Sequence, residues 1–234
     1  MKRPTKFAMI GAGGIGCALA PMLCREGHLV IIDADKYEPG NVTRQFPALT
    51  STENKAKTLA ELIQQQTLNK VDWIDSYLRD ALLTGREEWR GVDMIVGGVD
   101  NNASRRIIVE VAECLDIPAI LAGNEHEHGE AHLYIPGHYN PFDHFSFPET
   151  EPVPWGCNTD KALEEHPQTA IANILAAGCT MHLLLSYLKV SNPLNAIVYS
   201  RNDALSSTYK RAKDMLASAG AEPQTCASTQ DANT

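Results

Sequence analysis

A glycine-rich stretch near the start of the chain has the residues needed to bind phosphate groups. It fits the G-x-G-x-x-G pattern between a short apolar run and a helix-like stretch, and its glycines are Gly11, Gly13, Gly14 and Gly16. Glycines let the backbone approach phosphates closely, and a helix start offers amide hydrogens and a positive dipole end. Asp33 and Asp35 follow the next apolar run, where an acid can bond ribose hydroxyls. The pattern predicts a nucleotide site, but so far it describes a nicotinamide dehydrogenase equally well.

Polar and charged residues further along the chain separate dehydrogenases from enzymes of phosphate transfer. These residues are Asn41, Arg44, Gln45, Lys55, Asp100 and Arg105. A dehydrogenase needs neither Arg nor Lys beside the phosphates. A nucleotidyl-transfer enzyme needs cations to stabilise charge on the α-phosphate and on the leaving pyrophosphate. An acid at the carboxyl end of a strand, here Asp100, can hold Mg²⁺ there. Each residue alone also fits an ordinary role as a solvated lysine, a helix-surface arginine or a helix cap. Their joint order favours nucleotidyl transfer.

The elements that must position these residues alternate along the chain. Apolar runs predict strands over 6–10, 29–32, 71–74, 92–97, 118–122 and 131–135, with a last strand over 195–199. Helical spacing predicts helices over 17–26, 53–66, 103–115 and 167–190. This alternation is typical of an α/β fold with a doubly wound, Rossmann-like, mostly parallel sheet and helices on both faces. The carboxyl ends of such strands converge at one crevice, where the separate motifs can meet.

Length and composition predict a single large domain over residues 1–217 of the 234. Five prolines and few aliphatic residues mark 136–160 as a long crossover loop, and the small polar residues of 218–234 predict a disordered tail. Twenty basic against 29 acidic residues give a net charge of −9, which argues against binding to nucleic acid or to an anionic membrane. We expect no signal peptide and no membrane span, and hence a cytoplasmic protein with reduced thiols.

Five elements, in order and spacing, resemble the ThiF/MoeB/HesA group, the bacterial relatives of ubiquitin-activating enzymes. They are Gly11-Ala-Gly-Gly-Ile-Gly16, Ile32-Asp-Ala-Asp35, Asn41-Val-Thr-Arg44-Gln45, Lys55-Ala56 and Val99-Asp100-Asn-Asn-Ala-Ser-Arg105. The resemblance covers roughly residues 5–190, which is most of the chain. It is far more specific than the glycine motif alone.

The resemblance implies an enzyme that binds ATP and Mg²⁺ together with the Gly-Gly tail of a small ubiquitin-like or sulfur-carrier protein of the β-grasp fold. The tail carboxylate attacks the α-phosphate and gives an acyl-adenylate and pyrophosphate. By position, Asp33 contacts the ribose, while Asp100 binds Mg²⁺ and Arg105 supports it. The residues expected at the phosphates are Asn41, Arg44 and Lys55, with Gln45 in the same motif. Relatives are usually dimers, so the resemblance also implies a homodimer that uses the apolar 167–190 helix.

Cys157 lies after the proline-rich segment, where the resemblance allows a cysteine to take the activated tail as a thioester or to carry sulfur as a persulfide. An ordinary loop cysteine is the alternative. The six cysteines include no C-x-x-C pair, so the zinc site of many relatives is not expected. Glu and His residues interleave within 125–144, which suits a solvated edge, a groove for the partner's tail or, less well, a metal site.

Two other functions fit parts of the pattern. One is an NAD-dependent oxidoreductase on the same fold, which predicts NAD binding without exchange of pyrophosphate into ATP. The other is a non-catalytic family member that acts as a binding subunit. Arg44, Lys55 and Asp100 argue against the second, because a subunit without catalysis has no need of them.

Overall fold

The computed structural model describes residues 6–45, 52–78, 89–99, 101–125, 128–144, 169–189, 194–202 and 204–211. Its strands are β1 (Lys6–Ile10), β2 (His28–Ile32), β3 (Val71–Ile74), β4 (Met94–Gly98), β5 (Ala119–Glu125), β6 (His128–Tyr134), β7 (Leu194–Asn202) and β8 (Ala204–Arg211). Its α-helices are α1 (Gly14–Leu23), α2 (Lys55–Gln66), α4 (Asn102–Cys114) and α6 (Ala170–Lys189), and two short 3₁₀ turns are η1 (Pro39–Asn41) and η3 (Pro141–Asp143). The predicted tail over 218–234 lies outside the described residues.

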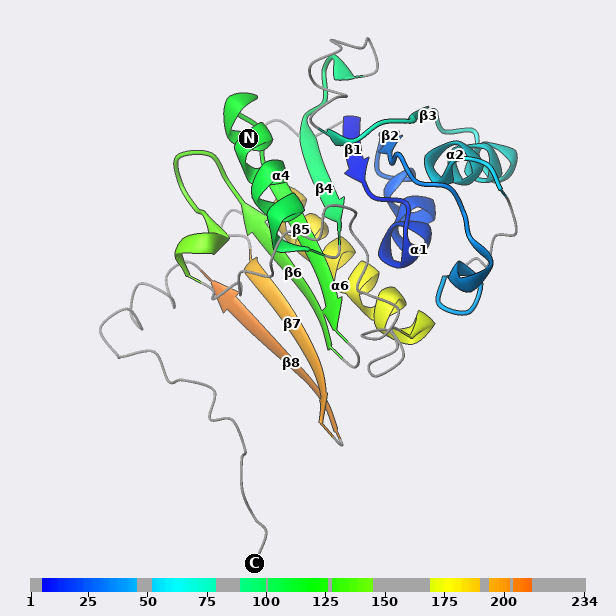
Figure 1. The fold of residues 1–234 in the computed structure, drawn as a ribbon. Helices are drawn as coiled ribbons and strands as arrows, with labels where there is room; N and C mark the ends of the chain where they lie inside the picture. The colour runs from blue at the N-terminus through cyan, green and yellow to red at the C-terminus, as the bar shows by residue number, and fades with distance from the viewer. Residues whose placement is uncertain are drawn as a thin grey trace, which may run out of the picture.

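The eight strands form one sheet in the order β3-β2-β1-β4-β5-β6-β7-β8 (Figure 1). The four pairings from β3 to β5 are parallel, and the three from β5 to β8 are antiparallel. The strand order reverses direction between β1 and β4, which places the crevice for a ligand at their carboxyl ends. This confirms the predicted doubly wound α/β fold with a mostly parallel sheet.

The final strand was missed by the sequence pattern, which ended the sheet at 195–199. β8 contains the polar run Ser206-Ser207-Thr208 and is paired residue by residue with β7. Its polar composition hides it from a search for apolar runs.

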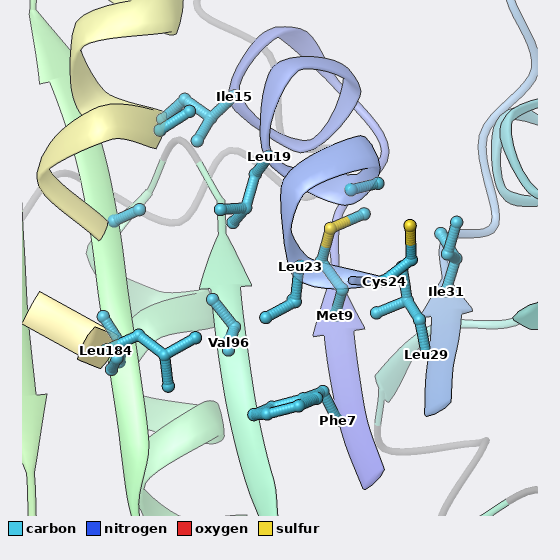
Figure 2. Close-up of a cluster of buried hydrophobic side chains, with 14 of the residues drawn as sticks. Phe7, Met9, Ile15, Leu19, Leu23, Cys24, Leu29, Ile31, Val96 and Leu184 are labelled. Atoms are coloured by element: carbon cyan, nitrogen blue, oxygen red, sulfur yellow. The ribbon is translucent and has the colours of Figure 1, made fainter. Parts of the chain in front are cut away.

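Strand residues alternate between two cores, one on each face of the sheet. In β1, Phe7 and Met9 belong to the core under α1, α2 and α6, whereas Ala8 and Ile10 belong to the core under α4. Figure 2 shows the first of these cores, in which side chains of α1 and α6 meet those of β1, β2 and β4. The predicted helices on both faces are therefore confirmed, and the side-chain period of two assigns each residue to its face.

Helix α6 lies close against the sheet because small residues meet at the contact. A Cβ built on Gly129 of β6 would stand 3.0 Å from the backbone nitrogen of Ala176. Among the described helices, α6 is the one that is long and apolar enough to cross a membrane by length and composition. Core helices pass the same test, and the buried side of α6, with Leu183 and Leu184, lies in the core under α1.

A buried ion pair joins α4 to β6 across β5. The Arg105 guanidinium lies 3.0 Å from Glu130 Oε1, and His132 Nε2 donates to Glu130 Oε2 at 3.0 Å. A side chain on Gly123 of β5 would collide with that guanidinium, so the crossing requires glycine there. Burial alone would raise the pKa of the Glu130 carboxyl, but hydrogen bonds and charges from His132 and Arg105 outweigh it and lower the pKa to about 2.

The lowered pKa of Glu130 predicts a pH-dependent loss of stability in Glu130→Gln. The folded pKa lies below the unfolded value of 4.5, so the stabilisation is complete above pH 4.5 and is lost as the pH falls toward 2. Urea unfolding at neutral pH should show a loss of roughly 1–3 kcal/mol. The difference from the unsubstituted protein should shrink below pH 4.5. Glu53→Gln, which breaks the exposed pair with Lys57, is the control and should cost at most about 0.5 kcal/mol. A difference for Glu130→Gln that does not change with pH contradicts the assignment.

Candidate nucleotide site

The turn between β1 and α1 needs its glycines for two close backbone contacts. Gly11 has a φ of +91°, and a Cβ there would stand 2.7 Å from the carbonyl oxygen of Gly98 at the end of β4. A Cβ on Gly16 would collide with the carbonyl oxygen of Gly11. These contacts bring the carboxyl ends of β1 and β4 together at the point where the strand order reverses.

Helix α1 begins inside this turn rather than at residue 17, where apolar spacing placed it, and it ends at Leu23 rather than 26. Gly13 is its N-cap residue and provides no side-chain cap, so the first amides of the helix remain available to an anion. Apart from its chain neighbours, no atom of the described residues lies within 4 Å of the place where a Gly13 side chain would begin. The predicted phosphate cradle is therefore an open helix start.

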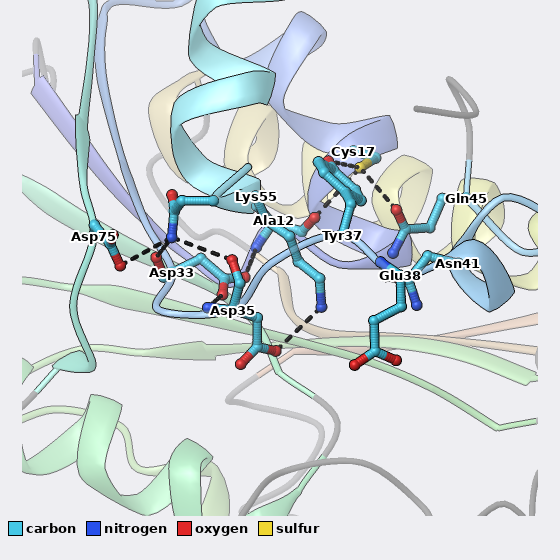
Figure 3. Close-up of polar contacts among 11 residues, drawn as sticks. Ala12, Cys17, Asp33, Asp35, Tyr37, Glu38, Asn41, Gln45, Lys55 and Asp75 are labelled. Carbon is cyan, nitrogen blue, oxygen red and sulfur yellow. Dashed lines mark hydrogen bonds and ion pairs between the residues drawn. The ribbon is translucent and has the colours of Figure 1, made fainter. Parts of the chain in front are cut away.

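Asp33 fixes this turn against the end of β2. Its Oδ2 accepts a hydrogen bond from the backbone of Ala12 at 2.6 Å, and its Oδ1 accepts one from the backbone of Asp35 at 2.7 Å (Figure 3). Burial raises the pKa of the Asp33 carboxyl to about 6, although these two hydrogen bonds act in the opposite direction. Asp33 therefore braces the site, and each of its oxygens keeps a second lone pair for the predicted ribose contact.

Lys55 lies at the start of α2 and reaches toward the same acids. Its Nζ lies 3.1 Å from Asp35 Oδ2, with the lysine side chain 10% exposed and the aspartate 48% exposed. The Lys55 backbone nitrogen also donates to the carbonyl oxygen of Asp35 at 2.8 Å. By contrast, Lys57 pairs with the exposed Glu53, which lies just before the N-cap residue of α2. The geometry thus supports the choice of Lys55 over Lys57 as the cation of the site.

Asn54 was missed by the sequence pattern and holds this corner together. Its side-chain oxygen caps α2 by accepting from the Lys57 backbone at 2.9 Å. Its Nδ2 donates to the carbonyl oxygens of Asp33 at 2.8 Å and Asp35 at 3.2 Å, and to Asp75 Oδ1 at 3.0 Å. Asn54 is 5% exposed, so the ends of β2 and β3 and the start of α2 share one buried amide. The signal that could have found it is the preference for Asn as an N-cap residue.

The segment after β2 carries Arg44 on a buried scaffold. Asn41 and Gln45 are each 5% exposed, and the carbonyl oxygen of Asn41 accepts from the backbones of Arg44 at 3.2 Å and Gln45 at 3.1 Å. The thiol of Cys17 lies 3.2 Å from the hydroxyl of Tyr37 and 3.8 Å from Gln45 Oε1 (Figure 3). The buried positions of Asn41 and Gln45 favour a scaffolding role, and their contact with phosphates stays a prediction.

Cys17 ties this segment to α1. Its thiol donates to the carbonyl oxygen of Ala12 at 3.4 Å, and burial raises its pKa to about 11. The thiol therefore stays protonated at neutral pH and acts as a hydrogen-bonding core residue rather than a nucleophile.

Arg44 itself has a partly exposed side chain. The structure shows no ion pair of its guanidinium within the described part of the chain, in contrast to Lys55.

Two predicted residues lie outside the described residues. They are Asp100, the candidate Mg²⁺ ligand, and Cys157, the candidate acceptor of the activated tail, so both roles stay predictions.

The helix after β4 is capped by Asn101, whose Oδ1 accepts from the Ser104 backbone at 2.7 Å, and not by Asp100 as one alternative held. Arg105 is 8% exposed and is turned into the ion pair with Glu130, so support of the nucleotide would be indirect.

The His and Glu segment is only partly described. Among the described residues, no group of three or more His, Cys, Asp or Glu side chains is placed to hold a metal ion. His132 and Glu130 belong to the ion pair with Arg105, and His126 and Glu127 lie outside the described residues. The use of this segment as a groove for a partner's tail stays a prediction.

The chain matches one family model over most of its length and is similar to several named proteins. The ThiF family model matches residues 3–220. Ubiquitin-like modifier-activating enzyme 5 of Aedes aegypti is 27% identical over 208 residues, which cover 80% of this chain and 51% of that protein. The adenylyltransferase and sulfurtransferase uba4 of Neosartorya fischeri is 33% identical over 125 residues, which cover 51% of this chain and 23% of that protein. The chain thus spans about half the length of the curated relatives it matches, or less.

Solved structures share the fold. The crystal structure of Escherichia coli MccB with ATP has a TM-score of 0.67 and 21% sequence identity, and the match covers 88% of this chain and 63% of that one. The crystal structure of PaaA has a TM-score of 0.66 and 21% identity, with 88% and 64% covered.

Alanine substitutions at Gly16 and at Gly13 should have different effects, the first on folding and the second on ATP binding. Gly16→Ala should unfold or strongly destabilise the protein, because its methyl group collides with the Gly11 carbonyl. Gly13→Ala meets no atom and should fold normally, yet its methyl group intrudes on the open helix start and should weaken ATP binding roughly 10-fold or more. Thermal unfolding and ATP titration measure the two effects. Tight ATP binding by Gly13→Ala would show that phosphates do not approach this turn.

Proposed function

Because the chain belongs to the ThiF family, we propose that it uses ATP to adenylate the C-terminal carboxylate of a small ubiquitin-like or sulfur-carrier protein. The observation that carries this proposal is the buried Lys55 cation, which is linked through Asp35 and Asp33 to the turn that precedes the open helix start at Gly13. A nicotinamide dehydrogenase has no use for such a cation at the phosphates. The names of the relatives, an activating enzyme and an adenylyltransferase, agree with this chemistry.

The proposed reaction is one substitution at phosphorus. A carboxylate oxygen of the protein tail attacks the α-phosphorus of ATP, and the bond from that phosphorus to the bridging oxygen of the β-phosphate breaks. Pyrophosphate leaves with the bonding electron pair, and the product is an acyl-adenylate. Negative charge accumulates on the α-phosphate and on the leaving group, so fixed positive groups lower the barrier.

Residues of this chain supply those groups. The amides of α1 face the phosphates from the turn at Gly13, and Lys55 and Arg44 add positive charge from α2 and from the segment after β2. The contact with Asp35 holds the Lys55 ammonium in place until phosphates compete for it. Asp100 is the residue proposed to hold Mg²⁺, which when bound neutralises phosphate charge. A net charge of −9 remains compatible with ATP because the positive groups gather in one crevice.

Exchange of labelled pyrophosphate into ATP, with candidate β-grasp proteins as acceptors, tests the reaction. Lys55→Ala should lower the exchange rate roughly 100-fold or more, because a preorganised group that stabilises transition-state charge is lost. Lys57→Ala is the matched control: it removes a lysine two residues away whose pair with Glu53 is on the surface, and exchange should stay within about 2-fold of the unsubstituted rate.

Three outcomes contradict the proposal. Equal rates for Lys55→Ala and Lys57→Ala would remove Lys55 from the site. No exchange with any acceptor, together with tight binding of NAD, would make the protein an oxidoreductase. ATP binding without exchange would indicate a non-catalytic binding subunit.

We further infer that two copies associate through the outer face of α6. Ile171 is 64% and Ile174 43% exposed there, the partly exposed Leu175 and Leu185 lie on the same face at helical spacing, and the exposed His182 lies between them. Apolar side chains aligned on one face of a helix are costly in water and favour association.

Replacing one of these side chains by a charge tests the dimer. Ile174→Lys should convert the protein to a monomer in sedimentation or light scattering, because a buried lysine without a partner opposes association. Leu115→Lys, at a leucine that is 42% exposed at the end of α4, is the control and should leave the dimer intact. A dimer that survives Ile174→Lys places the interface elsewhere.

A further inference from the structure

Asn173 is a buried polar residue in an apolar helix. It is 2% exposed and lies on the inner side of α6 between small neighbours such as Ala172 and Ala176. Burying an amide is unfavourable unless its polar atoms find partners. The hydrogen-bond partners of Asn173 must therefore offset the cost of burying its amide.

The Asn173 amide bonds two segments that are distant in sequence. Its Nδ2 donates to the carbonyl oxygen of Arg44 at 2.6 Å, and its Oδ1 accepts from Asn124 Nδ2 at 2.9 Å. Since a carbonyl accepts and an amide nitrogen donates, these partners fix the orientation of the amide. Asn124 lies near the carboxyl end of β5, the parallel strand beside β4.

The same amide lies directly on the glycine-rich turn. A Cβ on Gly14 would collide with the Oδ1, Cγ and Nδ2 atoms of Asn173. Gly14 is thus required by a side chain of α6, whereas Gly11 and Gly16 are required by backbone contacts. One side chain touches the start of α1, the Arg44 peptide and the end of β5.

We propose that Asn173 is a positioning residue for ATP adenylation, which sets the Arg44 backbone at a fixed distance from the start of α1 so that the Arg44 guanidinium and the helix amides act on the same phosphates. This inference rests on the proposed function. Arg44 is already held on its amide side, where its nitrogen donates to the Asn41 carbonyl at 3.2 Å. Asn173 holds the carbonyl side, so the Arg44 backbone is fixed on both sides.

A purely structural role for Asn173 makes a different prediction. If the amide only anchored α6, its loss would reduce the free energy of unfolding. Its effect on kcat would then be independent of Arg44, so the fold-changes of the two substitutions would multiply. If it acts through Arg44, its effect disappears once the guanidinium is gone. A double-mutant cycle separates these cases.

The cycle consists of the unsubstituted protein, Asn173→Ala, Arg44→Ala and the double variant, each measured for pyrophosphate exchange and for ATP binding. Asn173→Ala should lower kcat roughly 10- to 100-fold, because small misplacements of a catalytic group cost about that much. In the Arg44→Ala background the same substitution should change kcat by less than about 3-fold. Asn173→Asp should be as harmful as Asn173→Ala, because it sets a carboxylate oxygen against the Arg44 carbonyl.

Thr180→Ala is the matched control. Thr180 is 1% exposed on the same side of α6, and its hydroxyl donates within the helix to the Ala176 carbonyl at 2.8 Å. It should lower the unfolding temperature without changing kcat by more than about 2-fold, because it perturbs the core but not the Arg44 peptide.

The outcomes distinguish failure of the positioning role from failure of the proposed function. Multiplicative effects of Asn173→Ala and Arg44→Ala overturn the positioning role and leave the proposed function standing. An Arg44→Ala variant with full exchange overturns the positioning role and removes Arg44 from the proposed site. Absence of both exchange and ATP binding in the unsubstituted protein overturns the proposed function itself.

Discussion

The two hydrogen bonds of the Asp33 carboxylate join the turn after β1 to the end of β2, and the candidate site is built around them. A carboxylate in this position meets the backbone amides of Ala12 and Asp35, which would otherwise lack acceptors beside the crevice. Burial makes the arrangement costly, as the raised pKa of Asp33 shows. The two bonds hold the turn before α1 against the end of β2, and the Asp35 side chain next to them pairs with Lys55.

Around this brace, buried amides set the relative positions of the segments that carry charge. Asn54 joins the ends of β2 and β3 to the start of α2, and Asn173 joins α6 to the segment of Arg44. Each amide donates and accepts at once, so it fixes two distances with one side chain. Neutral buried residues thus set the positions of the segments that carry Lys55 and Arg44, the cations proposed to act on the phosphates.

Most of the fold could be predicted from the sequence because apolar periodicity reflects burial directly. The apolar runs found seven of the eight strands, and helical spacing found the four long helices, with ends shifted by a few residues. β8 escaped because its sequence is mostly polar, and its pairing with β7 is visible only in the folded chain. The start of α1 was misplaced because its first turn contains Gly14 and Gly16, which are needed for close contacts and are poor helix formers.

The candidate site, too, could be predicted only in part from the sequence. Motif spacing is enough to identify the residue types available for phosphate chemistry, because the glycine motif, Asp33, Arg44 and Lys55 occur at informative spacings. Their surroundings become visible in the folded chain alone: Lys55 pairs with Asp35, Lys57 pairs with Glu53, and Arg105 pairs with Glu130. Asn173 shows why, since its contact with the Arg44 carbonyl joins residues 129 positions apart. Local spacing cannot encode such a contact, because it exists only when the sheet and helices bring distant segments together.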